Sequence, residues 1–105
     1  VNLAGNTATV TGTTQQTIDS YPSGTYRTAK YLIEAKDNNT AGAYLAAEIL
    51  LTHDDSIVSM TEYSMVLMTT AFTTFDADIS GGNVRLLATS TSSNTTYKVA
   101  RTLLI

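Results

Sequence analysis

Residues 25–36 read Thr-Tyr-Arg-Thr-Ala-Lys-Tyr-Leu-Ile-Glu-Ala-Lys, and their side chains fall into two alternating sets. The more apolar set comprises Arg27, Ala29, Tyr31, Ile33 and Ala35. Because successive side chains of a strand point to opposite faces of a sheet, the alternation predicts a strand with this set on its core face. The segment is the clearest indication in the chain of an all-β fold.

The residues that follow predict a hairpin. Asp37 to Gly42 reads as its loop, because Asp, Asn and Gly tolerate positive φ angles. Residues 43–52 contain many good helix formers, so a helix is the alternative for this segment. A strand is favoured, since the large apolar residues also alternate here: Leu45, Ala47, Ile49 and Leu51.

The second half of the chain predicts four further strands separated by polar turns. The first, Ile57 to Thr69, follows a turn at 53–56 and is expected to have Thr61, Tyr63, Met65 and Leu67 on one face. Phe72 to Ile79 is a shorter strand, with Phe75, Ala77 and Ile79 inward. Ser80 to Asn83 is the clearest turn, and it precedes a strand from Val84 to Thr89. The last strand covers residues 96–105 after a polar loop at 90–95.

The N-terminal part is harder to interpret. Thr7 to Thr17 alternates loosely and suits an exposed or edge strand, and residues 1–15 are the least certain of the chain. Asp19 to Gly24 contains the only proline and is expected to be a loop. Together the elements predict an antiparallel β-sandwich or a small jelly roll of about seven to eight strands. We expect residues 1–105 to form a single domain.

Composition excludes several classes of protein. Twenty of the 105 residues are threonine, charged residues make up 14%, and the formal net charge is −3. Such a chain has no basic stripe for nucleic acid, no apolar run for membrane insertion and no cysteine for a disulfide or thiolate metal site. The start at Val1 does not resemble a signal peptide. We expect a processed product or a part of a longer protein.

Three groups of polar residues could carry chemistry. Asp76 to Gly81 copies the opening of a calcium loop, but Leu87 stands where the closing glutamate belongs. His53 lies beside two aspartates, where a solvated turn is the preferred interpretation. Glu48 and Glu62 lie on successive strands, where ion pairing is a simpler explanation than a glycosidase pair. We therefore expect no catalytic residue, no metal site, no cofactor and no enzymatic activity.

Two sets of apolar or aromatic residues are candidates for contacts with other molecules. Tyr21 and Tyr26 flank the loop at Pro22 to Gly24, and exposed tyrosines stack on sugars and anchor interfaces. Leu103, Leu104 and Ile105 end the chain, and exposed apolar residues at a free terminus favour association. The first pair is the candidate ligand site, and the second group is a candidate interface.

The segments at residues 26–31 and 78–86, with several others, resemble a domain that recurs in virion structural and tail-fibre proteins of marine and cyanobacterial tailed phages. The resemblance covers about residues 15–104. Its most specific pieces are Tyr-Arg-Thr-Ala-Lys-Tyr at 26–31 and Asp-Ile-Ser-Gly-Gly-Asn-Val-Arg-Leu at 78–86. It implies a component of the virion and brings no established catalytic residues with it.

Two hypotheses follow from this resemblance. A structural module of a fibre, tail appendage or capsid-surface decoration is expected to form a homo-oligomer, with a trimer favoured, and to contact other virion proteins. An adhesin is expected to bind a host surface glycan near its loops. The structural module is the preferred hypothesis, and an enzyme is the least favoured.

Overall fold

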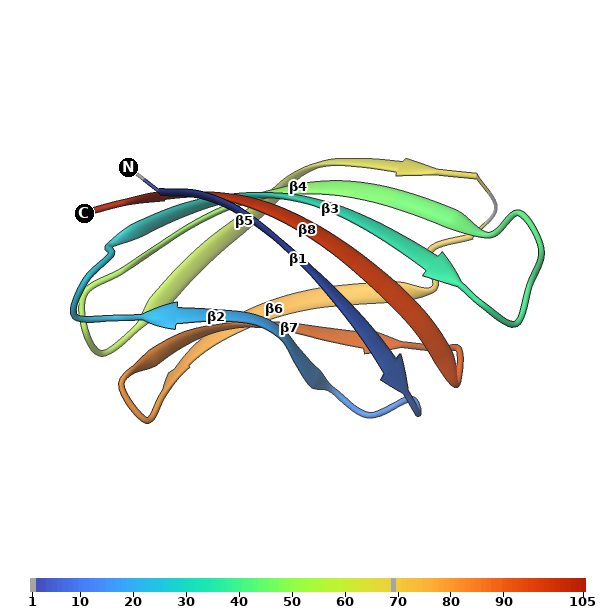
Figure 1. The fold of residues 1–105 in the computed structure, drawn as a ribbon, viewed down its shortest axis with the longest axis horizontal. Coiled ribbons are helices and arrows are strands. Elements are labelled where there is room, and N and C mark those ends of the chain that lie inside the picture. The colour runs from blue at the N-terminus through green and yellow to red at the C-terminus, as the bar shows by residue number, and fades with distance from the viewer. Residues whose placement is uncertain (1, 69) are drawn as a thin grey trace.

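The computed structural model describes residues 2–68 and 70–105, which form eight strands in two antiparallel sheets (Figure 1). The strands are β1 (Asn2–Thr11), β2 (Gln16–Pro22), β3 (Thr28–Asp37), β4 (Tyr44–His53), β5 (Val58–Leu67), β6 (Thr73–Ser80), β7 (Asn83–Ser90) and β8 (Asn94–Leu104). One sheet has five strands in the order β1-β8-β3-β4-β5, and the other has three in the order β2-β7-β6. The prediction of an all-β sandwich is confirmed.

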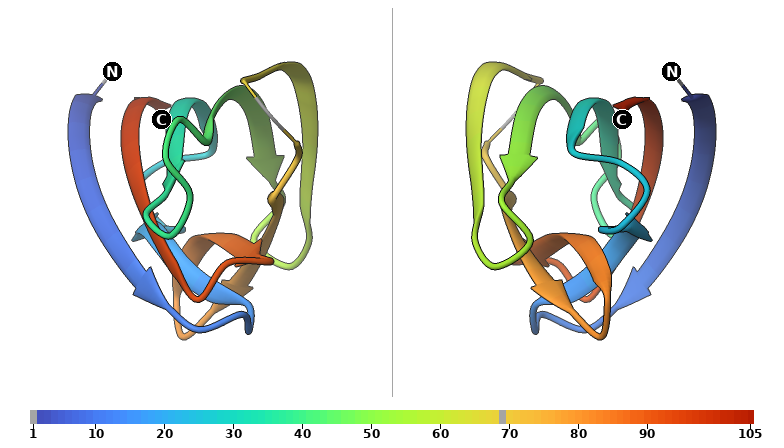
Figure 2. Two further views of the ribbon diagram at one scale, coloured as in Figure 1. Left: turned by 90° about the vertical axis from the view of Figure 1, so that its right-hand side faces the viewer. Right: turned by 90° about the vertical axis from the view of Figure 1, so that its left-hand side faces the viewer.

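The two sheets are curved layers that face each other (Figures 1 and 2). The first and last strands pair antiparallel, with Asn2 opposite Leu103, so the two ends of the chain lie side by side. The pairs β3–β4, β4–β5 and β6–β7 are hairpins, whereas β1–β8, β3–β8 and β2–β7 join strands far apart in the chain. The arrangement leaves one face of each sheet toward the core and the other toward the outside.

The core consists of alternate residues from both sheets. Strand β3 buries the four apolar members of its predicted set, and β4 buries the alternating residues that favoured a strand over a helix there. From the smaller sheet, Ile18, Tyr21, Val84 and Leu86 are buried against them. The period of two in the sequence therefore identifies the core faces of these strands.

Glycines form the two predicted hairpin turns. Gly81 and Gly82 have φ angles of 60° and 81° and join β6 to β7 as a two-residue loop, which needs positive φ at both positions. Gly42 has a φ angle of 75° and stands just before β4. Both loops predicted from Gly and Asn are confirmed.

The N-terminal prediction is wrong in two respects. The expected strand Thr7 to Thr17 is the end of β1 and the start of β2, separated by a turn in which Gly12 has a φ angle of 97°. The expected loop from Asp19 to Gly24 is strand as far as Pro22. Proline is tolerated there because β2 is an edge strand and Pro22 is its last residue.

Strand β5 departs from simple alternation. The register against β4 shifts between the pairs Ile49–Glu62 and Glu48–Ser64, so Tyr63 is the extra residue of a bulge. The expectation of one shared face from Thr61 to Leu67 is therefore wrong. The predicted end of this strand, Thr69, lies outside the described residues, and β5 ends at Leu67.

Arg27 is the one member of the predicted core set that does not belong to the core. It precedes β3, and its side chain is exposed. Within residues 2–68 and 70–105 there is no helix of the length and apolar character that crossing a membrane requires.

Candidate interaction surface

Exposed large apolar residues are distributed unequally between the two sheets. Within the described residues they lie only on strands of the five-stranded sheet or directly beside them. They are Leu32, Tyr44, Leu50, Ile57, Tyr63, Val66, Leu67, Met68, Leu104 and Ile105. Because single-domain proteins seldom gather such residues on one side, this side is the candidate interaction surface.

The outward side chains of β1, β8, β3, β4 and β5 form a surface that we call the outer face. Leu32 lies near its middle, directly between Ala100 on β8 and Glu48 on β4 in the register. Leu32 is 56% exposed and Leu50 is 45% exposed, although both belong to inner strands of the sheet. The outer face is therefore apolar near its centre as well as at its β5 edge, where Val66 is exposed.

The charges on the outer face are mixed in sign. It carries all three lysines of the chain, Lys30, Lys36 and Lys98, together with Glu34 and Glu48. Lys98 and Glu34 form an ion pair with an N–O distance of 3.8 Å. The Tyr63 hydroxyl donates a 2.7 Å hydrogen bond to Glu48, which raises the pKa of Tyr63. The face is close to neutral, whereas the whole chain has a net charge of −3.

The three C-terminal residues differ in how far their side chains are exposed. Leu103, one of the three candidate interface residues, is fully buried in the core, so its side chain is not available for contacts with another molecule. Leu104 is 44% exposed and Ile105 is 89% exposed. The alternation of β8 explains the difference, because Leu103 shares the core face with Tyr97 and Val99.

A buried polar cluster joins the two sheets, and no local pattern in the sequence predicts it. The Tyr31 hydroxyl donates a 2.8 Å hydrogen bond to Oδ2 of Asp19, and Nη1 of Arg101 lies 2.8 Å from the same oxygen. Nη1 of Arg101 also donates to the carbonyl of Ser20 at 2.9 Å. Desolvation, followed by the charge of Asp19, raises the pKa of Tyr31. These residues stabilise the sandwich and lie far apart in the chain.

The two tyrosines of the predicted ligand site lie in different environments. Tyr21 is 1% exposed, so the expectation that it is an exposed residue is wrong. Its burial raises its pKa to about 12. Tyr26 is partly buried, and its ring meets that of Tyr21 edge to face with centroids 6.4 Å apart. Of the two, only Tyr26 offers a surface to a ligand.

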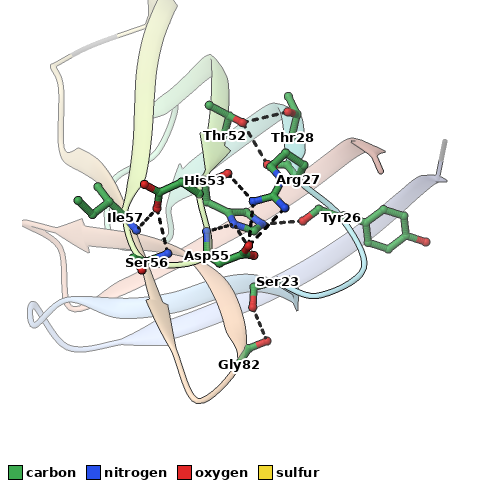
Figure 3. Close-up of polar contacts among 11 residues, drawn as sticks. Ser23, Tyr26, Arg27, Thr28, Thr52, His53, Asp55, Ser56, Ile57 and Gly82 are labelled. Atoms are coloured by element: carbon green, nitrogen blue, oxygen red, sulfur yellow. Dashed lines mark hydrogen bonds and ion pairs between the residues drawn. The ribbon is translucent and has the colours of Figure 1, made fainter.

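His53 is buried in a corner where two connections meet, so the interpretation as a solvated turn is wrong (Figure 3). Its Nε2 lies 2.7 Å from the carbonyl of Tyr26, and its Nδ1 accepts a 3.0 Å hydrogen bond from the backbone N–H of Asp55. Arg27 donates to the carbonyl of His53 at 3.0 Å and lies 3.3 Å from a carboxylate oxygen of Asp55. The imidazole therefore ties the β2–β3 connection to the β4–β5 turn.

The acidic residues considered for chemistry do not gather into one site. Glu48 and Glu62 are not opposite each other, because Glu48 faces Ser64 and Glu62 faces Ile49. Asp78 accepts a 2.7 Å hydrogen bond from Nε of Arg85, which lowers the pKa of Asp78. Within the described part of the chain, no three side chains of the metal-binding types come together.

Comparisons with known proteins find likeness in structure but not in sequence. No protein-family model matches the chain, and no curated protein matches it. Among solved structures, the tailspike protein of Acinetobacter baumannii phage AM24 matches with a TM-score of 0.60 and 9% identity over 96% of this chain. The tailspike of Acinetobacter phage vB_ApiP_P1 matches with a TM-score of 0.58 and 18% identity, also over 96% of this chain.

A third solved structure extends the same pattern. The tailspike of Acinetobacter baumannii bacteriophage Fri1, described as a capsular polysaccharide depolymerase, matches with a TM-score of 0.51 and 17% identity over 97% of this chain. The chain covers 26%, 21% and 17% of the three tailspike chains in turn. It spans about a quarter of their length or less, and it has the fold of a segment of these phage tailspike proteins.

Proposed function

We propose that this chain is a non-enzymatic structural module of a tailed-phage virion, in a fibre, tail appendage or capsid-surface decoration, that packs against copies of itself. The observation that carries the proposal is the restriction of exposed large apolar residues to the five-stranded side of the described molecule. The similarity of the fold to segments of phage tailspikes supports a place in the virion.

The outer face has the size that subunit packing needs. Strands of the larger sheet have 10 or 11 residues. With strands about 4.8 Å apart and a rise of roughly 3.3 Å per residue, five of them cover on the order of 800 Å². A standard protein interface buries about 800 Å² on each partner. One copy of the chain therefore presents enough area for a stable contact.

The charges favour a second copy as the occupant of this face. Lysines and glutamates alternate on it, so one outer face can oppose another without net repulsion. The remaining surface carries the net negative charge and is less suited to self-packing. A homotrimer is the expected assembly, with other virion proteins as further partners. The marine or cyanobacterial type of the phage stays a prediction.

Sedimentation equilibrium of the purified chain tests this function. The expected result is a trimeric mass at micromolar concentration, with dissociation only on dilution. A monomeric mass at high concentration contradicts the proposal. Labelling of phage particles with an antibody against the chain provides a second test. We expect label on tails, fibres or capsid surfaces, and particles without label would contradict the proposal.

Glycan binding is a second candidate, favoured by a polar pocket between the edges of the two sheets. The pocket has a volume of about 510 Å³ and is lined by Asn6, Thr17, Asp19, Ser20 and Arg101, among others. Amide, hydroxyl and guanidinium groups suit the hydroxyls of a sugar. A glycan array tests this candidate: specific binding that is lost in Asn6→Ala supports it, and an array without binding removes it. Tyr26→Ala tests the predicted contact between the Tyr26 ring and a sugar.

A further inference from the structure

The only histidine of the chain, His53, lies at a corner where two segments meet (Figure 3). Its side chain is buried, with 0% of its surface exposed. One ring nitrogen contacts the connection between β2 and β3, and the other contacts the turn between β4 and β5. Histidine is the side chain whose charge ordinarily changes between about pH 5 and pH 8. The contacts of this ring therefore determine how the corner responds to pH.

The two hydrogen-bond partners of the ring fit only its neutral form. The carbonyl oxygen of Tyr26, 2.7 Å from Nε2, can only accept, so Nε2 carries the proton. The backbone N–H of Asp55 can only donate, so Nδ1, at 3.0 Å, carries none. Both bonds exist together only while the imidazole is neutral. Because the side chain is buried, water does not replace either of them.

Asp55 is held in an uncommon backbone conformation. Its φ angle is 76°, the only positive value at a non-glycine residue in the described part of the chain. Residues with a side chain disfavour this region, and they persist in it where their surroundings hold them. The bond from the backbone N–H of Asp55 to Nδ1 of His53 is one such contact. A change at Nδ1 therefore acts directly on this position of the turn.

Two segments bring charged or titratable groups to the corner. The β2–β3 connection brings Tyr26, whose ring points away from the imidazole, and Arg27 (Figure 3). The turn brings Asp54, which accepts hydrogen bonds from two backbone N–H groups of the turn itself, and these bonds lower its pKa. The turn also brings the carboxylate of Asp55, with Oδ1 3.6 Å from Nδ1 of His53 and Oδ2 3.3 Å from Arg27. The Asp55 carboxylate is therefore the acidic group placed to face the ring.

We propose that His53 and Asp55 form a pH-sensitive switch in the β4–β5 turn, a property separate from the proposed function. When Nδ1 takes up a proton from solvent, it becomes a donor and faces another donor, the backbone N–H of Asp55. The carboxylate of the same residue then accepts from Nδ1, since its Oδ1 is already 3.6 Å away. Nε2 keeps its bond to the carbonyl of Tyr26 in both states. Protonation therefore rearranges the turn and leaves the β2–β3 connection attached.

Titration of the isotope-labelled chain between about pH 8 and pH 5, followed by NMR, tests the switch. The single histidine gives one set of ring nitrogen signals. At the upper end of this range we expect a neutral ring with its proton on Nε2. As the pH falls, the backbone amide signal of Asp55 should move with the same midpoint as the ring signals. A proton on Nδ1 in the neutral ring, a ring that does not titrate in the folded chain, or an Asp55 amide that does not follow the ring would each overturn the proposal.

Two matched variants test the role of the carboxylate. Asp55→Asn keeps the backbone N–H and removes the charge, so the ring should bind a proton at least roughly threefold more weakly. Asp54→Asn is the control, because it removes the neighbouring charge and keeps an oxygen for the bonds within the turn. We expect a smaller effect there. Equal weakening in both variants would show that the general charge of the turn acts on the ring, and it would contradict the switch. The same spectra report folding, and if Asp55→Asn does not fold, the wild-type titration decides.

Discussion

The hydroxyl of Tyr31, on the five-stranded sheet, donates a 2.8 Å hydrogen bond to the carboxylate of Asp19, on the three-stranded sheet. Both side chains are buried, so water does not replace this bond when it is lost. Arg101 shares the same carboxylate oxygen and supplies the opposite charge. The three residues form a polar connection across a largely apolar core.

Two different replacements of Tyr31 should therefore destabilise the fold to different extents. We expect Tyr31→Phe to lower the free energy of unfolding by about 1 to 2 kcal/mol, since Asp19 loses one of its partners. Tyr31→Ala also removes the ring and should cost about 3 kcal/mol or more. Denaturant unfolding measures both. Tyr63→Phe is the control, because it removes a similar bond at an exposed site and should change little.

The corner at His53 should be sensitive to a change of its imidazole. His53→Ala leaves the carbonyl of Tyr26 and the N–H of Asp55 without their buried partner, and we expect a loss of about 2 kcal/mol. Thermal unfolding by circular dichroism measures this loss. Ser56→Ala, in the same turn but exposed, should unfold like the wild type. Equal midpoints for His53→Ala and wild type would mean that the corner does not hold the connections together.

The hairpin between β6 and β7 should need glycine at its second turn position. Gly82 has a φ angle of 81°, so Gly82→Ala is strained and should destabilise by about 1 kcal/mol. Gly24→Ala is the matched control, because Gly24 has no positive φ and its added Cβ meets open space. We expect little change or a slight gain there. Equal losses in the two variants would contradict the turn geometry.

Stability should fall in acid. Hydrogen bonds to Asp37, first from the Ser92 hydroxyl, lower its pKa, and Arg85 lowers that of Asp78. A carboxylate with a lowered pKa in the folded state stabilises the fold above its unfolded pKa and loses this effect as pH falls through the folded value. The melting temperature should therefore drop between about pH 4 and pH 2.

A variant at Asp37 separates this effect from general acid unfolding. Asp37→Asn cannot be protonated in this range, so its melting temperature should depend less steeply on pH than that of the wild type. The exposed Glu62, changed to Gln, serves as the control variant and should keep the wild-type slope. Identical slopes for Asp37→Asn and wild type would show that Asp37 is not linked to folding.

The sequence was sufficient for the core of the fold but not for its polar contacts. Alternation in residues 29–35 and 45–51 identified buried faces, because a strand buries every second residue wherever one side of its sheet is covered. The glycines at 81 and 82 likewise identified a turn. The prediction for the start of the chain was wrong because β1 contains several threonines and few large apolar residues, so its two faces differ little in hydrophobicity.

The candidate interaction surface could be predicted only in part. Leu104 and Ile105 were candidates for an interface, and both side chains are exposed. Leu32 and Leu50 lie on the polar side of their alternating sets, and their importance appears only when neighbouring strands bring them onto one face. The pairing of Asp19 with Arg101 joins residues 82 positions apart, a distance over which strand patterning gives no information.

The proposed function requires the outer face to hold copies of the chain together, and sedimentation velocity of two matched variants tests this requirement. Leu32→Asp places a charge at the centre of the outer face, while Thr74→Asp places one on the exposed side of the three-stranded sheet. We expect a monomer for Leu32→Asp and an oligomer of wild-type size for Thr74→Asp, both with an intact fold by circular dichroism. An oligomer that survives in Leu32→Asp but is lost in Thr74→Asp would contradict it.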